Sequence, residues 1–381
     1  MNRRALLVIS NLEYGGAQRQ VVELANHMKA ERYDVHVCSL SDYIPLASSL
    51  HDADRRLHVI VKRWKFDITV IPRLAALCKQ LGAPLLHSYL FDADIAARLA
   101  GRLSGSAAVI NSERNTSYHL KKLQLLAYWL TRRCVDLTIA NSNAGAVFNS
   151  GLLGQDPTRY RVVHNGVDTD RFHPRNRLPI RQELGVPLDT PLVGMFASFK
   201  KQKNHPLAFK AMRRVLNRVP EARLLLVGEA LYAGMHGSAG YRRDMDRLVD
   251  ELMIRDRCLF VGNRDDVEKL YSACDVTILP SLFEGTPNVL LESMACGVPV
   301  VATDVSDNAL IAPDGQVGRI VPLDDEALAE AIIPLLLDHN QRDKTGSNAR
   351  QWAITQYSCA RLAEKTADVY DEVLAARRKA S

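Results

Sequence analysis

A strand–loop–helix pattern near residue 280 carries the two carboxylates with the clearest chemical potential in this chain. The apolar run 276–279 predicts a buried strand, and a helical pattern begins at about Asn288. Glu284 lies in the loop between them, and Glu292 lies on the first turns of the helix. Gly285 lets the backbone approach a ligand closely. We expect one carboxylate to reach a sugar and the other a ribose diol, with helix N–H groups facing a diphosphate.

A second loop brings lysines to the same edge of a predicted sheet. It follows the apolar run 192–196 and contains Lys200, Lys201 and Lys203. Lysines at the carboxyl end of a strand neutralise a bound diphosphate. We expect Asn204 to cap the helix that comes next. A solvated lysine-rich loop is the alternative, but the neighbouring glutamate motif favours phosphate binding.

Two glycines form the corresponding loop in the first half of the chain. Gly15 and Gly16 lie between the first strand pattern and a helix that opens at Ala17. N–H groups without a neighbouring Cβ favour a phosphate oxygen. The spacing matches neither the dinucleotide fingerprint nor the P-loop, so a plain tight turn remains an equal alternative.

Further polar residues follow strands of the first half. His87 closes one apolar run, and Glu113, Arg114 and Asn115 follow the next. These positions face the carboxyl edge of the predicted sheet, where open α/β sheets bind ligands. We include His87 and Arg114 as catalytic candidates. A structural role is the alternative for His87, because a histidine at a strand end is more often a satisfied core residue than a catalyst.

The elements that must position these residues alternate between short apolar strands and longer helical segments. Near-continuous apolar strands separated by helices predict parallel sheets covered on both faces, the doubly wound α/β architecture. In the first half, the expected strands are Ala5–Ile9, Val35–Ser39, Val59–Val61, Leu85–Ser88, Ala107–Ile110, Leu137–Ala140 and Arg161–His164. The expected helices there are Ala17–Lys29, Pro72–Leu81, Ala93–Arg102 and Ala144–Leu153.

The same alternation restarts after a polar stretch over 168–190. The expected strands are then Leu192–Phe196, Arg223–Val227, Leu259–Val261, Val276–Leu279 and Val300–Thr303. The expected helices are Pro206–Val219, Tyr241–Glu251, Val267–Ala273, Val289–Ala295 and a last one from Cys359 to about Arg377. We therefore predict two Rossmann-like domains, 1–172 and 173–358, with the helix 359–381 packing back on the first. The turn at 165–168 suits a hinge.

Composition narrows the class of protein. The chain has 381 residues, and its hydrophobic fraction of 47% and charged fraction of 24% are typical of a globular protein of two domains. Seven cysteines without a C-x-x-C pair indicate neither a disulfide framework nor a zinc site. No apolar run is long enough to span a bilayer, and the first one, Ala5–Ile9, is too short for a signal peptide. We expect a cytoplasmic protein.

Positive charge concentrates in the first half. Residues 1–170 hold 21 Lys+Arg and 15 Asp+Glu, so that 21 − 15 gives the whole net charge of +6. The segment Leu120–Cys134 adds leucines at helical spacing, flanked by basic residues. That composition suits a helix on an anionic membrane surface at the inner face of the membrane, and an ordinary helix packed on its sheet is the alternative. We expect no nucleic acid partner.

Several motifs together resemble the retaining glycosyltransferases of family four, and the similarity extends over nearly the whole chain. It is carried by Gly15-Gly-Ala-Gln-Arg, Asn165-Gly-Val-Asp, Lys203-Asn-His, Leu226-Val-Gly, Phe260-Val-Gly, Ala273-Cys-Asp and the segment from Pro280 to Thr303. The last segment, Pro-Ser-Leu-Phe-Glu-Gly-Thr-Pro-Asn-Val-Leu-Leu-Glu, looks very like the double-glutamate signature of that family. The resemblance implies the GT-B fold, with two Rossmann-like domains and an interdomain cleft.

The resemblance also implies roles for single residues. Glu284 would lie near the donor sugar, Glu292 would hold the ribose, and Lys203, helped by Lys200, would hold the diphosphate. Gly16 would approach the phosphates from the first domain. The backbone around the helix start would contact sugar hydroxyls or phosphates, through Gly285, Thr286, Pro287, Asn288 and Val289. Such enzymes usually need no metal, and no cofactor is implied beyond the nucleotide-sugar substrate, a UDP-sugar being slightly favoured over a GDP-sugar.

This sequence departs from the family pattern at one charged position. Many members have an arginine five residues before the lysine that matches Lys203, and here that position is Ser198. Lys200 or Lys201 would take its place, although a lysine lacks the two-pronged reach of arginine. The implied function is transfer of a hexosyl or N-acetylhexosaminyl group to a glycan or lipid-linked acceptor in polysaccharide or glycolipid biosynthesis. Alternatives are a sugar-nucleotide 2-epimerase of the same fold and a non-catalytic nucleotide-sugar-binding scaffold.

Overall fold

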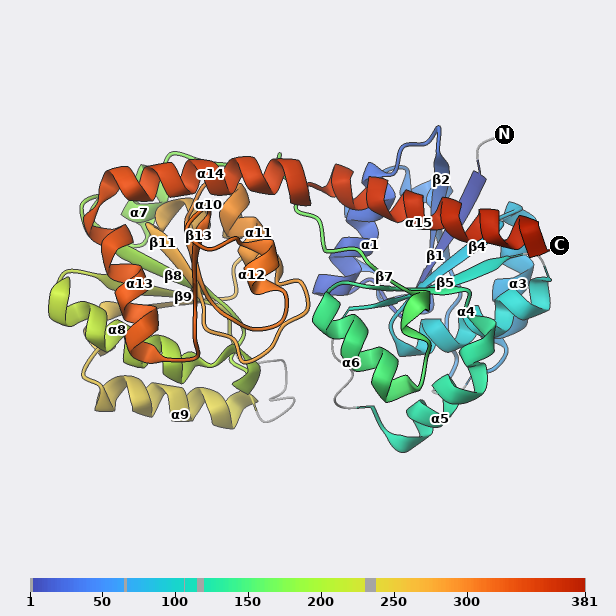
Figure 1. Ribbon diagram of the computed structural model, residues 1–381, viewed down its shortest axis with the longest axis horizontal. Coiled ribbons are helices and arrows are strands. Elements are labelled where there is room, and N and C mark those ends of the chain that lie inside the picture. Colours follow the sequence, from blue (N-terminus) through green and yellow to red (C-terminus); the bar gives the residue numbers. More distant parts are fainter. Residues whose placement is uncertain (1–2, 65–66, 106, 115–119, 230–237, 381) are drawn as a thin grey trace. The chain divides into compact units, whose positions relative to one another are not determined.

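The computed structural model describes residues 3–64, 67–105, 107–114, 120–229 and 238–380. It divides into two compact units (Figure 1). Unit 1 comprises Met1–Gly166 and Cys359–Ser381, and unit 2 comprises Val167–Ser358. The first unit thus ends at Gly166 rather than at residue 172. Within the described ranges, no helix is long and apolar enough to cross a membrane.

Unit 1 contains a seven-stranded parallel sheet with the order β3-β2-β1-β4-β5-β6-β7. Its strands are β1 (Arg3–Ile9), β2 (Tyr33–Ser39), β3 (Leu57–Val59), β4 (Leu85–Tyr89), β5 (Ala108–Glu113), β6 (Leu137–Ala140) and β7 (Tyr160–Val162). Its helices are α1 (Gly16–His27), α2 (Ala53–Arg56), α3 (Val70–Leu81), α4 (Phe91–Ser104), α5 (Lys122–Thr131), α6 (Asn143–Leu153) and α15 (Cys359–Ala380).

Alternating apolar residues explain why helices cover both faces of this sheet. Leu7 and Ile9 of β1 belong to a core cluster formed with α1 and α15. Leu6 and Val8 of the same strand belong to a second cluster, formed with α3 and α4. Successive side chains of a strand point to opposite faces, so an apolar residue at every position must be buried on both sides.

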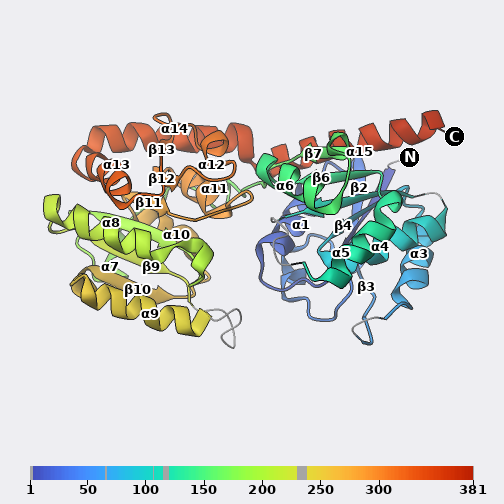
Figure 2. The ribbon, with the colours of Figure 1, turned by 60° about the horizontal axis from the view of Figure 1, so that its bottom comes forward.

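Unit 2 contains a six-stranded parallel sheet with the order β10-β9-β8-β11-β12-β13. Its strands are β8 (Leu192–Phe196), β9 (Arg223–Val227), β10 (Cys258–Gly262), β11 (Val276–Leu279), β12 (Val300–Thr303) and β13 (Gly318–Val321). Its helices are α7 (Leu178–Glu183), α8 (His205–Arg218), α9 (Ser238–Glu251), α10 (Val267–Ala273), α11 (Asn288–Ala295), α12 (Asn308–Ile311), α13 (Asp325–Leu337) and α14 (His339–Tyr357). On one face of the sheet α8 packs beside α13 (Figures 1 and 2).

Both sheets reverse their strand order once, which confirms the predicted doubly wound Rossmann-like architecture. In unit 1 the chain runs from β1 outward to β3 and then restarts at β4 on the other side of β1. In unit 2 it runs from β8 outward to β10 and restarts at β11 on the other side of β8. Loops that leave neighbouring strands in opposite directions open a crevice at such a reversal, and ligands of open α/β sheets bind there.

Five elements of unit 2 lie outside the sequence-based expectations: α7, α12, β13, α13 and α14. Gly318 opens β13 at the sheet edge, where an added Cβ would lie 1.9 Å from the carbonyl oxygen of Val300. A strand that contains Gly and Arg lacks the apolar signal. Helix α14 is mostly polar and buries four residues: Gly346, Ala349, Ala353 and Tyr357. A shift also occurs at the edge strand β3, which covers Leu57–Val59 rather than Val59–Val61 because pairing with β2 sets its bounds.

The chain passes between the units at two adjacent points. Gln20 of α1 accepts a hydrogen bond from the backbone N–H of Gly166 at 2.9 Å and donates one to its carbonyl oxygen at 2.8 Å. A Cβ at Gly166 would lie 2.9 Å from the Cα of Cys359, so glycine is required for this close approach. One residue further, Val167 donates its N–H to the carbonyl oxygen of Tyr357 at 2.8 Å.

A fully buried arginine anchors the amino-terminal edge of the sheet in unit 2. Arg181 of α7 forms an ion pair with Asp275 at 2.8 Å and donates to the carbonyl oxygens of Ala273, Pro187, Leu188 and Thr190. The same Asp275 oxygen accepts the N–H of Leu192 at the start of β8. Because Asp275 immediately precedes β11, this network ties together the two strands at the reversal.

We therefore expect Arg181→Met to destabilise unit 2 strongly. The substitution keeps most of the volume but removes the ion pair to Asp275 Oδ2 and the donor of four backbone carbonyl oxygens, while Arg177 and Arg342 still pair with Asp275 Oδ1. Breaking a buried ionic network in this way costs about 3–5 kcal/mol. The measurement is urea-induced unfolding, with Arg213→Met on the exposed side of α8 as a matched control. A loss below about 1 kcal/mol, within the range of exposed ion pairs, would contradict the anchoring role.

Candidate active site

The two loops predicted to bind a ligand in unit 2 meet at the reversal of its sheet. The lysine loop leaves the end of β8, and the glutamate loop leaves the end of β11, its direct neighbour. The short 3₁₀ turn Lys201–Lys203 and the loop before α11 lie in contact, since Leu282 donates its N–H to the carbonyl oxygen of Gln202 at 2.9 Å. The structure thus brings the lysines and Glu284 together, as the sequence predicts.

The carboxylate of Glu284 is buried and held by partners from both loops. Lys203 Nζ lies 2.5 Å from Glu284 Oε1, and the Ser281 hydroxyl donates to the same oxygen at 2.6 Å. Gln202 donates to the carbonyl oxygen of Phe283 at 2.9 Å and fixes the loop beside it. A carboxylate buried in this way requires a compensating cation. Glu284 is therefore preorganised as a fixed acceptor at the end of β11.

Lys200 is the second cation of this loop. Its pKa is lowered by burial and then by the neighbouring Lys203, whereas Glu284 raises it. Lys201 is exposed. Of the two lysines considered as substitutes for the arginine missing at Ser198, Lys200 is the one in electrostatic contact with the site. Asn204 adopts a left-handed conformation with φ 52° before α8 and makes no side-chain cap, which corrects the expected capping hydrogen bond.

Glu292 lies on α11, and a buried tyrosine orients its carboxylate. The Tyr271 hydroxyl of α10 donates to Glu292 Oε2 at 2.8 Å. Tyr271 is fully buried and stacks on Phe196 at the end of β8, with ring centroids 3.8 Å apart. Burial and then the negative charge of Glu292 raise the pKa of Tyr271 well above its ordinary value, so the hydroxyl remains a donor.

Helix α11 begins at Asn288, as predicted, directly after this loop. Pro287 occupies the N-cap position and offers no side-chain cap, while Gly285 and Thr286 are buried. The N–H of Glu284 donates to the Ser306 hydroxyl at 3.1 Å, which fixes the loop against the end of β12. Asn288 and Val289 are half-buried at the first turn. The positive end of the helix dipole thus faces the same edge as Lys203.

The glycine loop of unit 1 lies at the corresponding reversal, after β1. Gly15 is the N-cap of α1 with an extended backbone, and Gly16 is the exposed first residue of the helix. Gln18 folds back under the loop and donates to Asn11 Oδ1 at 2.8 Å. The structure therefore presents Gly16 at the start of α1 without a side chain in front of it.

His87 lies inside unit 1 near the end of β4. Its Nδ1 is 2.7 Å from the Tyr370 hydroxyl of α15, and its Nε2 is 2.8 Å from the Ser112 hydroxyl of β5. The ring is fully buried, and burial together with Arg114 lowers its pKa to about 3. Both nitrogens are occupied, so the geometry favours the structural alternative for this histidine.

Arg114 follows β5 and is half-buried at the same edge. It donates to Asn165 Oδ1 at 2.6 Å, and its carbonyl oxygen accepts from Asn141 Nδ2 at 3.0 Å. Glu113 is buried, accepts from the Tyr160 hydroxyl at 3.2 Å, and has its pKa raised to about 7 mainly by burial. Asn115 lies outside the described residues. Arg114 thus links the edge of the sheet to the turn at 165–168.

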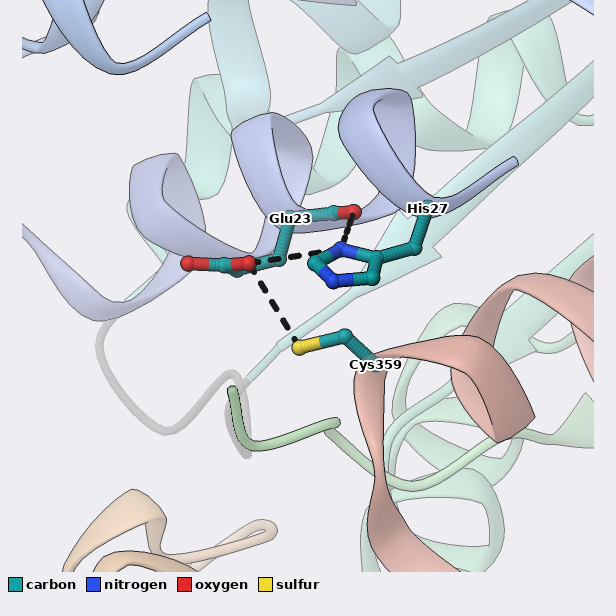
Figure 3. A group of neighbouring side chains, drawn as sticks. All are labelled: Glu23, His27 and Cys359. Atoms are coloured by element: carbon teal, nitrogen blue, oxygen red, sulfur yellow. Dashed lines mark hydrogen bonds and ion pairs between the residues drawn. The ribbon is translucent and has the colours of Figure 1, made fainter. Parts of the chain in front are cut away.

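Among the described residues, one group of three ligands lies close enough to hold a metal ion: Glu23, His27 and Cys359 (Figure 3). Glu23 and His27 lie one turn apart on α1 and point toward Cys359 at the start of α15. The Cys359 thiol donates to Glu23 Oε2 at 3.5 Å, and His27 Nδ1 lies 3.5 Å from the same oxygen. These contacts join α15 to α1 in unit 1, whereas Glu284 belongs to unit 2.

Sequence reasoning missed the residues that orient the two glutamates. Ser281 and Gln202 lie within the recognised motifs, but their types carry no signal for contact with Glu284. Tyr271 and Ser306 are distant in sequence from the carboxyl group and the N–H that they contact, so only the folded sheet brings them there.

The neutral state of His87 makes unit 1 sensitive to acid. The unfolded chain binds a proton near pH 6.5, whereas the folded protein resists protonation down to about pH 3. The free energy of unfolding therefore falls as the pH drops below about 6.5, by about 2 kcal/mol at pH 5 from this group. We expect His87→Gln to remove this contribution, so that the free energy of unfolding falls less between pH 7.5 and pH 5. Denaturation experiments at the two pH values measure the difference. An unchanged pH dependence would mean that His87 takes up a proton as readily in the folded protein as in the unfolded chain.

Two consecutive family models match the chain in order. The model for Glycosyltransferase Family 4 covers residues 14–171, and that for Glycosyl transferases group 1 covers 176–352. The chain is 24% identical to UDP-Gal:alpha-D-GlcNAc-diphosphoundecaprenol alpha-1,3-galactosyltransferase of Escherichia coli, with 94% of both chains covered. It is 26% identical to alpha-maltose-1-phosphate synthase of Mycolicibacterium smegmatis, over 95% of this chain and 96% of that protein.

Solved structures share the fold. Anabaena HepE in complex with UDP superposes with a TM-score of 0.82 at 21% identity, over 97% of this chain and 100% of that one. WaaG, a glycosyltransferase involved in lipopolysaccharide biosynthesis, gives a TM-score of 0.68 at 19% identity, over 96% and 99%. With both halves matched in order, the chain belongs to the glycosyl transferases group 1, Glycosyltransferase Family 4, and is a glycosyltransferase of the GT-B fold.

Proposed function

We propose that this protein is a retaining glycosyltransferase that moves a hexosyl or N-acetylhexosaminyl group from a UDP-sugar to a glycan or lipid-linked acceptor. The proposal places it in polysaccharide or glycolipid biosynthesis at the cytoplasmic side of a membrane. The observation that carries it is a pair of oriented glutamates at the reversal of the sheet. Glu284, in the loop before α11, forms an ion pair with Lys203, and Glu292, on α11, accepts a hydrogen bond from Tyr271.

In this proposal the two glutamates bind different parts of the donor. Glu292 accepts hydrogen bonds from the ribose hydroxyls, and the hydrogen bond from Tyr271 to its Oε2 fixes the orientation of the carboxylate. Glu284 contacts the sugar, because it precedes α11 and lies nearer the end of β11. N–H groups around Gly285 and Asn288 face the remaining hydroxyls and phosphates.

The principal electrostatic task is to stabilise the departing diphosphate. Lys200 and Lys203 lie beside the start of α11, where Lys203 is also ion-paired with Glu284. In unit 1, the corresponding helix start at Gly16 offers N–H groups of its own. Burial already lowers the pKa of Lys200, so its ammonium gains more from a bound diphosphate than an exposed lysine would. This arrangement supplies the charge that a divalent cation would otherwise provide, and we propose that no metal takes part.

Retention requires the new bond to form on the face that the leaving group vacates. The acceptor oxygen bonds to the anomeric carbon as the bond from that carbon to the diphosphate oxygen breaks. The acceptor proton passes to the departing phosphate oxygen. We assign positioning roles to His87 and Arg114: His87 fixes the end of β4, and Arg114 fixes the turn around Asn165.

The names of similar proteins support this donor and acceptor class. The Escherichia coli relative is named for a UDP-galactose donor and an acceptor linked to diphosphoundecaprenol. HepE was crystallised with UDP and with UDP-glucose. A UDP-sugar and a lipid-linked or glycan acceptor are therefore the first combination to assay.

Substitution of the two glutamates separates donor binding from turnover. We expect Glu292→Ala to raise the Kd for UDP about 10- to 100-fold, because hydrogen bonds to a charged group are worth about 1.5–3 kcal/mol. Glu284→Ala should change the Kd less but lower kcat about 100-fold, as loss of a preorganised electrostatic group does. Calorimetry with UDP measures the Kd, and initial rates with a UDP-sugar measure kcat. Glu326→Ala on α13 is the matched control.

Unaltered binding and rates in both glutamate variants would refute the site. The stereochemistry is read by NMR of the product, in which an inverted anomeric centre would refute retention. Release of an isomerised nucleotide sugar without acceptor would instead identify a 2-epimerase. Donor binding without turnover over a broad acceptor panel would identify a scaffold.

A further inference from the structure

Helix α5 has its polar side inside and its apolar side outside. The two buried residues of the helix are Tyr128 and Thr131, and both make polar contacts. The Tyr128 hydroxyl donates to Asp94 of α4 at 2.9 Å. Arg98 of α4 donates to the Thr131 hydroxyl at 3.2 Å. A surface helix of a globular protein normally shows the reverse arrangement.

The outer face of α5 consists of large apolar side chains. Their exposed fractions are 76% for Leu123, 50% for Leu126, 53% for Trp129 and 65% for Leu130. Single exposed apolar residues are ordinary, but a contiguous group of this size marks an interaction surface.

Helix α6 extends this face. It packs against α5 (Figure 1). Its residues Val147 and Leu152 are exposed. An open groove of about 590 Å³ runs between the two helices, lined by Leu126, Trp129 and the residues 151–154. We call the six exposed apolar residues and this groove the α5–α6 surface.

Positive charge surrounds the α5–α6 surface. Lys121 and Lys122 lie exposed at the start of α5, and Arg132 and Arg133 follow its end. Arg132 lies over the Trp129 ring at 4.4 Å from its centroid. A pocket of about 160 Å³ adjoins the groove at Gly154, and its charged lining residues are Arg132, Arg133, Arg159, Asp136 and Asp156.

Negative charge is almost absent from the same stretch of chain. Residues 114–155 contain five Lys+Arg and one carboxylate, Asp136. That carboxylate is paired with Arg377 of α15, at 2.9 and 3.0 Å. The surface therefore combines apolar side chains with an excess of positive charge, which complements a layer of phosphate groups over hydrocarbon.

We propose that the α5–α6 surface docks on an anionic lipid bilayer. The leucines and Trp129 enter the boundary between headgroups and acyl chains, while Lys121, Lys122 and the arginines pair with lipid phosphates. The contacts of Tyr128 and Thr131 with α4 hold the helix on unit 1 in the orientation that keeps its apolar side outward. The inference concerns unit 1 alone and does not depend on the donor site of unit 2.

Vesicle co-sedimentation without any sugar nucleotide tests this docking. The purified full chain is mixed with vesicles of phosphatidylcholine alone or with about one third phosphatidylglycerol. We expect binding to the anionic vesicles at least about tenfold tighter than to the neutral ones, and weaker as salt is raised. Equal binding to both compositions, or none at low salt, would overturn the proposal.

Two pairs of substitutions separate the apolar and charged contributions. Leu126→Glu with Leu130→Glu, and Lys121→Glu with Lys122→Glu, should each weaken binding at least about tenfold. The matched controls on unit 2 are Leu310→Glu with Leu337→Glu, and Lys210→Glu with Arg213→Glu, which alter exposed residues by the same charge. We expect the controls to bind as the wild type does.

Other outcomes would assign the surface differently. If the controls lose as much vesicle binding as the α5–α6 variants, the binding depends on net charge alone, and the docking site is overturned. A dimer in sedimentation equilibrium that Leu126→Glu dissociates, without vesicle binding, would assign the surface to a second copy of the chain. UDP binding by calorimetry should be unchanged in every variant, so failure here is distinguishable from failure of the proposed function.

Discussion

The need to pair a buried carboxylate governs the site of unit 2. Glu284 is buried at the end of β11 and depends on the ammonium group of Lys203, which a different loop supplies from the end of β8. These loops meet because β8 and β11 are neighbours at the single reversal of strand order. The Arg181–Asp275 network holds the opposite ends of the same strands, since Asp275 binds the N–H of Leu192. The position of the loop that holds Glu284, and the pairing of its charge, therefore depend on the packing of β8 against β11.

Unit 1 repeats the topology but uses its polar residues differently. Its reversal presents Gly16 at a helix start, where backbone N–H groups rather than side chains face a ligand. His87 is turned inward to Tyr370 of α15, so this histidine links the carboxyl-terminal helix to the sheet. On the other side of the unit, α5 turns Tyr128 inward and its leucines outward. The two functions that we propose, donor contact and lipid contact, are thus carried by separate elements.

The sequence predicted the strands that are continuously apolar, and with them the fold and the loops that hold Glu284 and Lys203. It did not predict β13 or α14, because an edge strand opened by Gly318 and a helix that buries mainly small residues lack a hydrophobic pattern. The partners Ser281 and Tyr271 could not be inferred, because the role of a hydroxyl group depends on which residues it contacts in the folded protein. Asn204 was placed correctly before α8, yet its left-handed backbone excludes the expected side-chain cap.

The most direct test of the account is the melting temperature of the purified protein with UDP, GDP and ADP and with their sugars. A ligand that binds only the folded state raises this temperature, by an amount that grows with the logarithm of its concentration divided by its Kd. We predict a rise with nucleoside diphosphates, because the lysines and Glu292 are already in place for a diphosphate and a ribose. The proposed donor predicts that the rise is largest with UDP and UDP-sugars. The absence of any rise at millimolar nucleotide would contradict a preorganised donor site at the β8–β11 reversal.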